Sequence, residues 1–267
     1  TGGSIRIPAA ACGLVGLKPS YDELPLDGVF PLSRTLDHVG PIGRSVDDAR
    51  LLYEAMGGSP GPMGVQDVRG LRFGVLRGYF DEKIDPAVAD AFEAVCARLR
   101  DAGAVLQDVS VTQARTIGAV YLLISLPEAA AVHADALDSC PERFSPNVRT
   151  RLDAARYLLA EDAARARHGQ RVLRAEVDAL IAGHDALLTP TMPILATRLG
   201  HATVRMEVAR QQRALRRGLD TPTTAGEITA GEITAGARLA RARQRGEHSA
   251  QTIMAKIRER LTRDQIT

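Results

Sequence analysis

The sequence predicts an α/β protein built on a partly parallel sheet, and three observations support this fold class. With 267 residues, 45% of them hydrophobic, the chain can bury one substantial core. A strand, a helix and a second strand follow one another between residues 71 and 109, the order of a crossover between parallel strands. Helical patterns then follow at about 113–137 and about 147–182.

The N-terminal part is predicted to be short of regular structure. Residues 1–40 are rich in Gly and Pro, which favours tight loops and short strands over helix. Ser45 followed by Asp48 resembles a capping box that opens a helix, and Gly57 and Gly58 close it.

The crossover unit has its own start and stop signals. Residues 71–76 and 105–109 are predicted strands. Asp85 and Pro86 are typical of an N-cap and a first helical turn, and Gly103 ends the helix between the strands. A last short strand is predicted at 186–188, followed by an extended TPTMP segment.

Composition argues against several classes of function. Only 4% of the residues are aromatic and there is no Trp, so base stacking and aromatic cages for cations are poorly supplied. Three cysteines at wide spacing and six scattered histidines predict no disulfide framework and no metal site. A reducing, cytoplasmic compartment is therefore expected. No apolar run approaches the length of a membrane span, and no cofactor motif is found.

Charge divides the chain into two parts. Residues 1–200 carry 21 basic and 25 acidic side chains, whereas residues 201–267 carry 13 and 7. We expect one domain over 1–200 and an Ala- and Arg-rich helical tail over 201–267. The tail is interpreted as a solvated helix face, with contact to nucleic acid or to an acidic surface as the alternative.

The chemistry-bearing motif is the opening turn, where Ser4 follows Gly2 and Gly3. Glycines allow unusual backbone angles, so that neighbouring N–H groups can converge on one point. A serine in such a turn could attack an acyl carbon while those N–H groups stabilise the developing oxyanion. Taken alone, the turn also fits a plain structural loop.

The sequence that surrounds this turn resembles the amidase signature family. The resemblance rests on TGGSIRIP at 1–8 with AAACGLVGLKP at 9–19, on LDHVGPIGRSVDD at 36–48, and on LLTPTMP at 187–193, in the order of the family. It covers about residues 1–200. The first segment is highly specific, and the last is weak alone.

The resemblance implies an amide hydrolase with a Ser, cis-Ser, Lys triad on an open mixed sheet covered by α-helices. Ser4 matches the nucleophile, and Thr1, Gly2 and Gly3 match the oxyanion-hole turn. The bridging serine and the catalytic lysine lie before this turn in the family. We therefore expect a domain truncated on its N-terminal side and inactive by itself.

Supporting residues are also expected near the turn. Arg6 and Asp37 are predicted to hold the active-site loops by a charge-assisted hydrogen bond. Of the three lysines, Lys18 resembles a structural position, and the other two lie in unrelated contexts. His38 could assist Ser4, although a variable position without a role is the preferred interpretation.

Several functions stay open. The first is an amidase acting on a small-molecule amide. A second is an amidotransferase A-type subunit that takes ammonia from glutamine for a transfer RNA-linked substrate, the one case in which nucleic acid contact is expected. A non-catalytic remnant or pseudoenzyme is a third. An N-terminal threonine nucleophile is disfavoured because it leaves the motif from Arg6 to Pro19 unexplained. A homodimer is left open.

Overall fold

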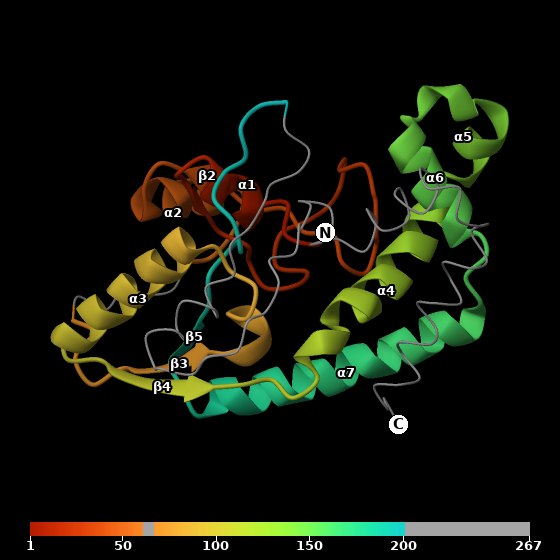
Figure 1. Cartoon of the computed structure of the whole chain (residues 1–267). Helices are drawn as coiled ribbons and strands as arrows, with labels where there is room; N and C mark the ends of the chain where they lie inside the picture. Colours follow the sequence, from red (N-terminus) through yellow and green to blue (C-terminus); the bar gives the residue numbers. More distant parts are fainter. Residues whose placement is uncertain (61–66, 201–267) are drawn as a thin grey trace.

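A computed structural model describes residues 1–60 and 67–200 (Figure 1). Its larger sheet has the strand order β4-β3-β5, with β3 at Arg72–Leu76, β4 at Val105–Val109 and β5 at Ala186–Leu188. Both pairings are parallel, with Phe73 opposite Leu106 on one side and Ala186 on the other. The predicted α/β class and all three predicted strands are confirmed. The expected tail, 201–267, lies outside the described residues.

The predicted crossover between β3 and β4 is confirmed. A short 3-10 turn, η1 at Gly78–Phe80, leads to helix α3 at Pro86–Asp101. The carboxylate of Asp85 accepts a hydrogen bond from the N–H of Ala87 at 2.9 Å, and Pro86 occupies the first turn. The Asp85 N–H donates to the carbonyl of Pro193 at 2.7 Å, which attaches the TPTMP segment to the start of α3.

The N-terminal part contains a helix that the sequence did not predict. Helix α1 runs over Arg6–Ala11, where tight loops and short strands were expected, so that prediction is wrong here. Pro8 lies in the first turn, where its missing N–H costs no helical hydrogen bond, and three alanines, Ala9 to Ala11, follow it. Burial of Ala9 fixes this helix against the rest of the fold.

A small antiparallel pair lies beside α1. Strand β1 at Val15–Gly16 pairs with β2 at Ile42–Gly43, and residues 17–41 form a long loop between them. Helix α2 at Val46–Ala55 follows directly, with the predicted capping box between Ser45 and Asp48 present in both directions. The antiparallel pair and the parallel sheet are separate in the described part of the chain.

The two long helical patterns each divide into several elements. The first gives η2 at Ala114–Thr116, α4 at Ile117–Val132 and α5 at Ala134–Ser139. The second begins after η3 at Pro141–Arg143 and gives α6 at Pro146–Ala155 and α7 at Ala160–Ala182. Helices α4 and α7 lie side by side (Figure 1) and share a core of Val120, Leu123, Ile124 and Ala166.

One stretch, Ala114–Val132, is long and apolar enough to cross a membrane by length and composition, with a mean hydropathy of 1.3. That is longer than the apolar runs that the sequence analysis recognised. In the fold its apolar side chains serve the core between α4 and α7, and Glu128 lies within it. These contacts are those of a core helix.

The Asp85 cap gives a first test of the fold. Asp85→Ala should lower the free energy of unfolding by about 1 kcal/mol, because the first turn of α3 loses its side-chain acceptor. Urea denaturation measures the difference. Asp90→Ala, at an exposed position inside the same helix, is the matched control and should stay within about 0.5 kcal/mol of the parent. Equal effects of both changes would contradict the assignment.

Candidate functional site

Ser4 lies in a tight turn that leads directly into α1. Its side chain is exposed, and the two residues before it have positive φ angles, 46° at Gly2 and 119° at Gly3. Such angles favour glycine over residues with a Cβ atom. The turn is closed onto α1 by the N–H of Ile7, which donates to the carbonyl of Gly3 at 2.9 Å.

The backbone donors of this turn are partly in use. The N–H groups of Gly3 and Ser4 both donate to the carbonyl of Thr1, at 2.7 and 3.2 Å. The sequence predicted that N–H groups of this turn face a substrate oxygen. In the observed arrangement, these two donors would reach such an oxygen only after the Thr1 carbonyl had turned away.

Tyr121 contacts the turn and was missed by the sequence analysis. A Cβ atom placed on Gly2 would meet the phenol of Tyr121, with Cζ at 2.7 Å. Tyr121 is the aromatic residue of the apolar helix α4, and its position 117 residues after Ser4 gives no local signal of the contact. The only hint was the single aromatic side chain among the mainly aliphatic residues of that helix.

Asp37 holds the turn from another side. Its carboxylate accepts hydrogen bonds from the Thr1 hydroxyl and from the N–H groups of Leu32 and Ser33, the latter two at 2.8 and 2.9 Å. Burial alone raises the pKa of Asp37, but these hydrogen bonds outweigh it and hold the pKa below its usual value. Asp37 is therefore an ionised acceptor at neutral pH.

Arg6 does not belong to this arrangement. Among the described residues the hydrogen-bond partners of Asp37 are Thr1, Leu32 and Ser33, so the predicted bond between Arg6 and Asp37 is not formed. Arg6 begins α1 with an exposed side chain, and its charge acts on Lys18 instead.

Lys18 is engaged with its own neighbourhood. Its ammonium donates to the carbonyl of Pro19 at 2.6 Å. Burial, followed by the charge of Arg6, lowers the pKa of Lys18, while Glu23 opposes the change. No contact between Lys18 and Ser4 is found among the described residues, so its assignment to a structural position stays a prediction.

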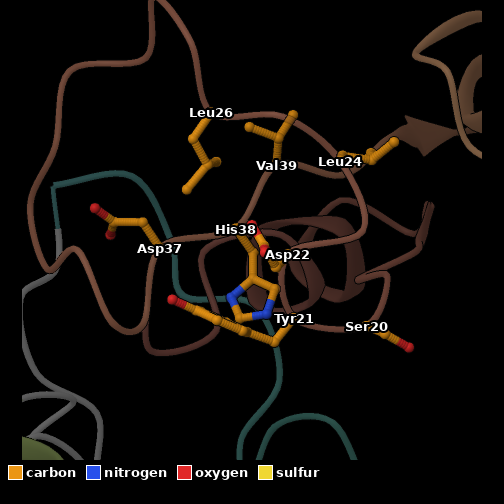
Figure 2. A pocket seen from close by; sticks show the side chains of 8 residues that line it. All are labelled: Ser20, Tyr21, Asp22, Leu24, Leu26, Asp37, His38 and Val39. Atoms are coloured by element: carbon orange, nitrogen blue, oxygen red, sulfur yellow. The ribbon is translucent and has the colours of Figure 1, made fainter.

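His38 faces a small pocket next to the loop (Figure 2). Its Nδ1 bonds to the Leu36 carbonyl at 2.8 Å, and its ring meets that of Tyr21 edge to face at 5.5 Å. The pocket also receives the side chains of Leu24 and Leu26, and its volume of about 20 Å³ is enough for a water molecule, not for an amide substrate. Ser4 is not among its lining residues.

All three cysteines are free. Within residues 1–60 and 67–200 no three His, Cys, Asp or Glu side chains gather into a group that could hold a metal ion.

The described residues thus define an α/β protein with a parallel sheet, covering helices and an exposed serine on a glycine turn. The amidase family model matches residues 1–226, beyond the domain boundary expected at residue 200. The chain belongs to the amidase family.

Two curated relatives and one solved structure illustrate the match. An amidase of Pseudomonas putida is 37% identical over 215 residues, 75% of this chain and 46% of that protein. The A subunit of the glutamyl-tRNA(Gln) amidotransferase of Rhodospirillum rubrum is 35% identical over 73% of this chain and 47% of that protein. A crystal structure of an amidase superposes with a TM-score of 0.74 at 35% identity, over 90% of this chain and 50% of that one. The chain spans about half the length of the relatives it matches.

The Asp37 hydrogen bonds predict a pH dependence of stability. Because the native pKa of Asp37 lies below its unfolded value of about 3.9, its contribution is full above about pH 5 and is lost as the pH falls through the native pKa. Asp37→Asn should cost about 1–3 kcal/mol at neutral pH. Denaturant titrations between about pH 7 and pH 2 should show a shallower acid loss for the variant; equal slopes would contradict the assignment.

The contact between Gly2 and Tyr121 predicts a steric effect. Gly2→Ala adds a methyl group against the phenol at a positive φ, so it should lower both stability and the reactivity of Ser4. Gly28→Ala is the matched control, because Gly28 has a φ of 79° and nothing within 4 Å of an added Cβ. The control should lose about 1–2 kcal/mol from backbone strain alone. Urea denaturation should give a larger loss for Gly2→Ala, and equal losses would argue against close packing of Tyr121.

Proposed function

We propose that the protein hydrolyses the C–N bond of a small-molecule carboxamide through an acyl intermediate on Ser4. The observation that carries the proposal is the exposed Ser4 hydroxyl on a double-glycine turn at the start of α1, in a chain of the amidase family. Identity of 37% to an amidase supports the same reaction class.

The chemistry follows from the serine. The Ser4 Oγ attacks the amide carbon and forms a C–O bond while its proton passes to a base. The C–N bond then breaks, and the nitrogen leaves with a proton as ammonia or an amine. Water next attacks the acyl carbon, releases the carboxylic acid and returns the proton to Ser4. The resemblance assigns the base to a lysine acting through a bridging serine, at positions outside the segments that match here.

The charge on the tetrahedral oxygen needs donors. The N–H groups of Gly2, Gly3 and Ser4 are the proposed donors, with the Thr1 carbonyl rotated out of its contact with Gly3 and Ser4 when a substrate binds. Because Gly2 and Gly3 carry no Cβ atom, such a backbone change meets little steric resistance.

A second candidate is ammonia release from glutamine as an amidotransferase A-type subunit. It is favoured by 35% identity to the A subunit of a glutamyl-tRNA(Gln) amidotransferase. The two candidates share the acyl-serine step and differ in the substrate and in the need for partner subunits. Activity with glutamine that appears only when such partner subunits are added would select the second. The free cysteines support a reducing, cytoplasmic setting for either.

Labelling by a fluorophosphonate tests the nucleophile. We would treat the protein encoded by the whole gene, its Ser4→Ala variant and its Ser145→Ala variant, and locate the adduct by mass spectrometry. Ser145 is the matched control, because it is an exposed serine at the start of a helix, immediately before α6. Addition to Ser4 in the parent and in Ser145→Ala, with none in Ser4→Ala, is the expected result.

Amide hydrolysis should fall at least about 10³-fold in Ser4→Ala, since the residual rate then comes from binding and oxyanion contacts alone. A folded parent protein that is not labelled at Ser4, or a variant that keeps its hydrolytic rate, would exclude the proposed mechanism. Labelling of the 267 residues alone would mean that the base lies within them and would contradict the expected inactivity.

A further inference from the structure

The carboxylate of Glu128, on helix α4, accepts four hydrogen bonds. Its Oε2 accepts from the Ser33 hydroxyl at 2.7 Å and from the Thr35 N–H at 3.1 Å. Its Oε1 accepts from the Thr35 hydroxyl at 2.7 Å and from the guanidinium of Arg167 on α7. The Glu128 side chain is only 18% exposed.

Apart from Arg167, the residues that donate to Glu128 lie in one short segment, residues 32–37, which we call the 32–37 loop. Its inner face is organised by Ser33, whose carbonyl accepts from the N–H groups of Leu36 and Asp37, each at 2.8 Å. The Asp37 carboxylate turns back to accept from the N–H groups of Leu32 and Ser33. Two carboxylates therefore hold the 32–37 loop, one from within it and one from α4.

The loop connects α4 to the nucleophile turn. Asp37 also accepts the Thr1 hydroxyl, and Thr1 supplies the carbonyl to which Gly3 and Ser4 are bonded. A continuous series of hydrogen bonds thus runs from Glu128 through the 32–37 loop to Ser4.

A second residue of helix α4, Tyr121, contacts the same turn directly. Tyr121 precedes Glu128 by seven residues, two helical turns, so both lie on one face of the helix. Tyr121 contacts Gly2 directly, while Glu128 acts on the 32–37 loop. Figure 1 shows the long loop between β1 and β2 extending from the α1 side of the molecule to α4.

The ion pair between Glu128 of α4 and Arg167 of α7 does not account for the other contacts of Glu128. Arg167 is 44% exposed, and a pair with such an exposed partner contributes little. The other three contacts of Glu128 come from neutral donors of the loop. Burial raises the pKa of Glu128, but the hydrogen bonds from Thr35 and Ser33 and the charge of Arg167 hold it below its usual value. An ionised acceptor is thus available at neutral pH.

We infer that Glu128 is a positioning residue, which fixes the 32–37 loop so that Asp37 can hold Thr1, and with it the turn that carries Ser4, in place. The inference rests on the proposed function for the claim that Ser4 reacts. It does not rest on that function for the claim that Glu128 orders the turn.

Two independent readouts separate these claims. Hydrogen exchange of the Gly3 and Ser4 amides measures the order of the turn without any chemistry. The rate of fluorophosphonate addition at Ser4, with kcat and KM for an amide substrate, measures its reactivity. Both are taken on the protein encoded by the whole gene.

Glu128→Gln is the test variant, because an amide in place of the carboxylate cannot accept from every donor that now surrounds it. We expect exchange of the Gly3 and Ser4 amides to rise about tenfold and labelling of Ser4 to slow about tenfold. The kcat value should fall while KM changes less than about twofold.

Matched controls isolate the loop. Glu82→Gln removes the partner of Arg115 at a carboxylate that does not contact the 32–37 loop, and it should behave as the parent. Arg167→Met removes the ion pair and the long 3.5 Å bond from Arg167 to the Thr35 hydroxyl, but leaves the three bonds from the loop to Glu128, and should change labelling less than about twofold. If Glu128→Gln does not fold, Thr35→Val removes one hydroxyl donor from the loop side at similar volume and should show the same pattern more weakly.

Each possible result either supports or overturns the inference about Glu128. Faster exchange throughout α4 and β3, to the same extent as at Gly3 and Ser4, would mean that Glu128 only stabilises the fold and would overturn the inference. Unchanged exchange at the turn would overturn it as well. A selective rise at the turn in a protein whose Ser4 is never labelled would support the positioning role and reject the proposed function.

Discussion

The carboxylate of Asp37 sets the constraint on which the site depends. A largely buried carboxylate must be surrounded by donors, because an unsatisfied one is costly. Here the donors come from Thr1 and from the N–H groups of Leu32 and Ser33. The fold therefore keeps the opening turn and the 32–37 loop together, although more than thirty residues separate them in the sequence. This arrangement fixes the position of the turn that carries Ser4.

The layers behind the turn give it a rigid support. The central strand of the parallel sheet, β3, pairs on both sides, and its last residue Leu76 packs in a cluster that includes Leu187 of β5 and Val177 of α7. Helix α7 in turn packs along α4. At the end of β3, Arg77 bonds to Glu93 of α3 at 2.6 Å and to Asp108 of β4 at 2.9 Å. The helix that contacts the nucleophile turn is thereby connected to the sheet.

Local rules predicted the parts of the fold that are local in origin. The Ser45 to Asp48 capping box, the Asp85 cap and the strand at 186–188 each depend on residues within a few positions of one another, and each was found where expected. Helix α1 was missed because Gly and Pro on both sides obscured three alanines, of which only Ala9 is fully buried.

Local sequence rules could not identify Glu128 and Tyr121, the residues of α4 that support the site. Glu128 meets Ser33 across 95 positions of the sequence, and Tyr121 meets Gly2 across an even longer interval, so no periodicity or short motif indicates either contact. The expected partner of Asp37 was the cation Arg6, since charge suggested a pair. Neutral donors took that position, because the helix that begins at Arg6 leaves its side chain in solvent.

The long loop between β1 and β2 is anchored on both flanks and exposed in the middle. On one flank Glu23 accepts the Tyr53 hydroxyl of α2, and on the other Glu128 holds Ser33 and Thr35. Between them Phe30 is 74% exposed and rests on His133 with ring centroids 5.5 Å apart. A protease that cut the chain near Phe30 would leave each new end tied to the body of the protein, so a nicked molecule could keep its shape in solution and separate into two pieces only under denaturing conditions.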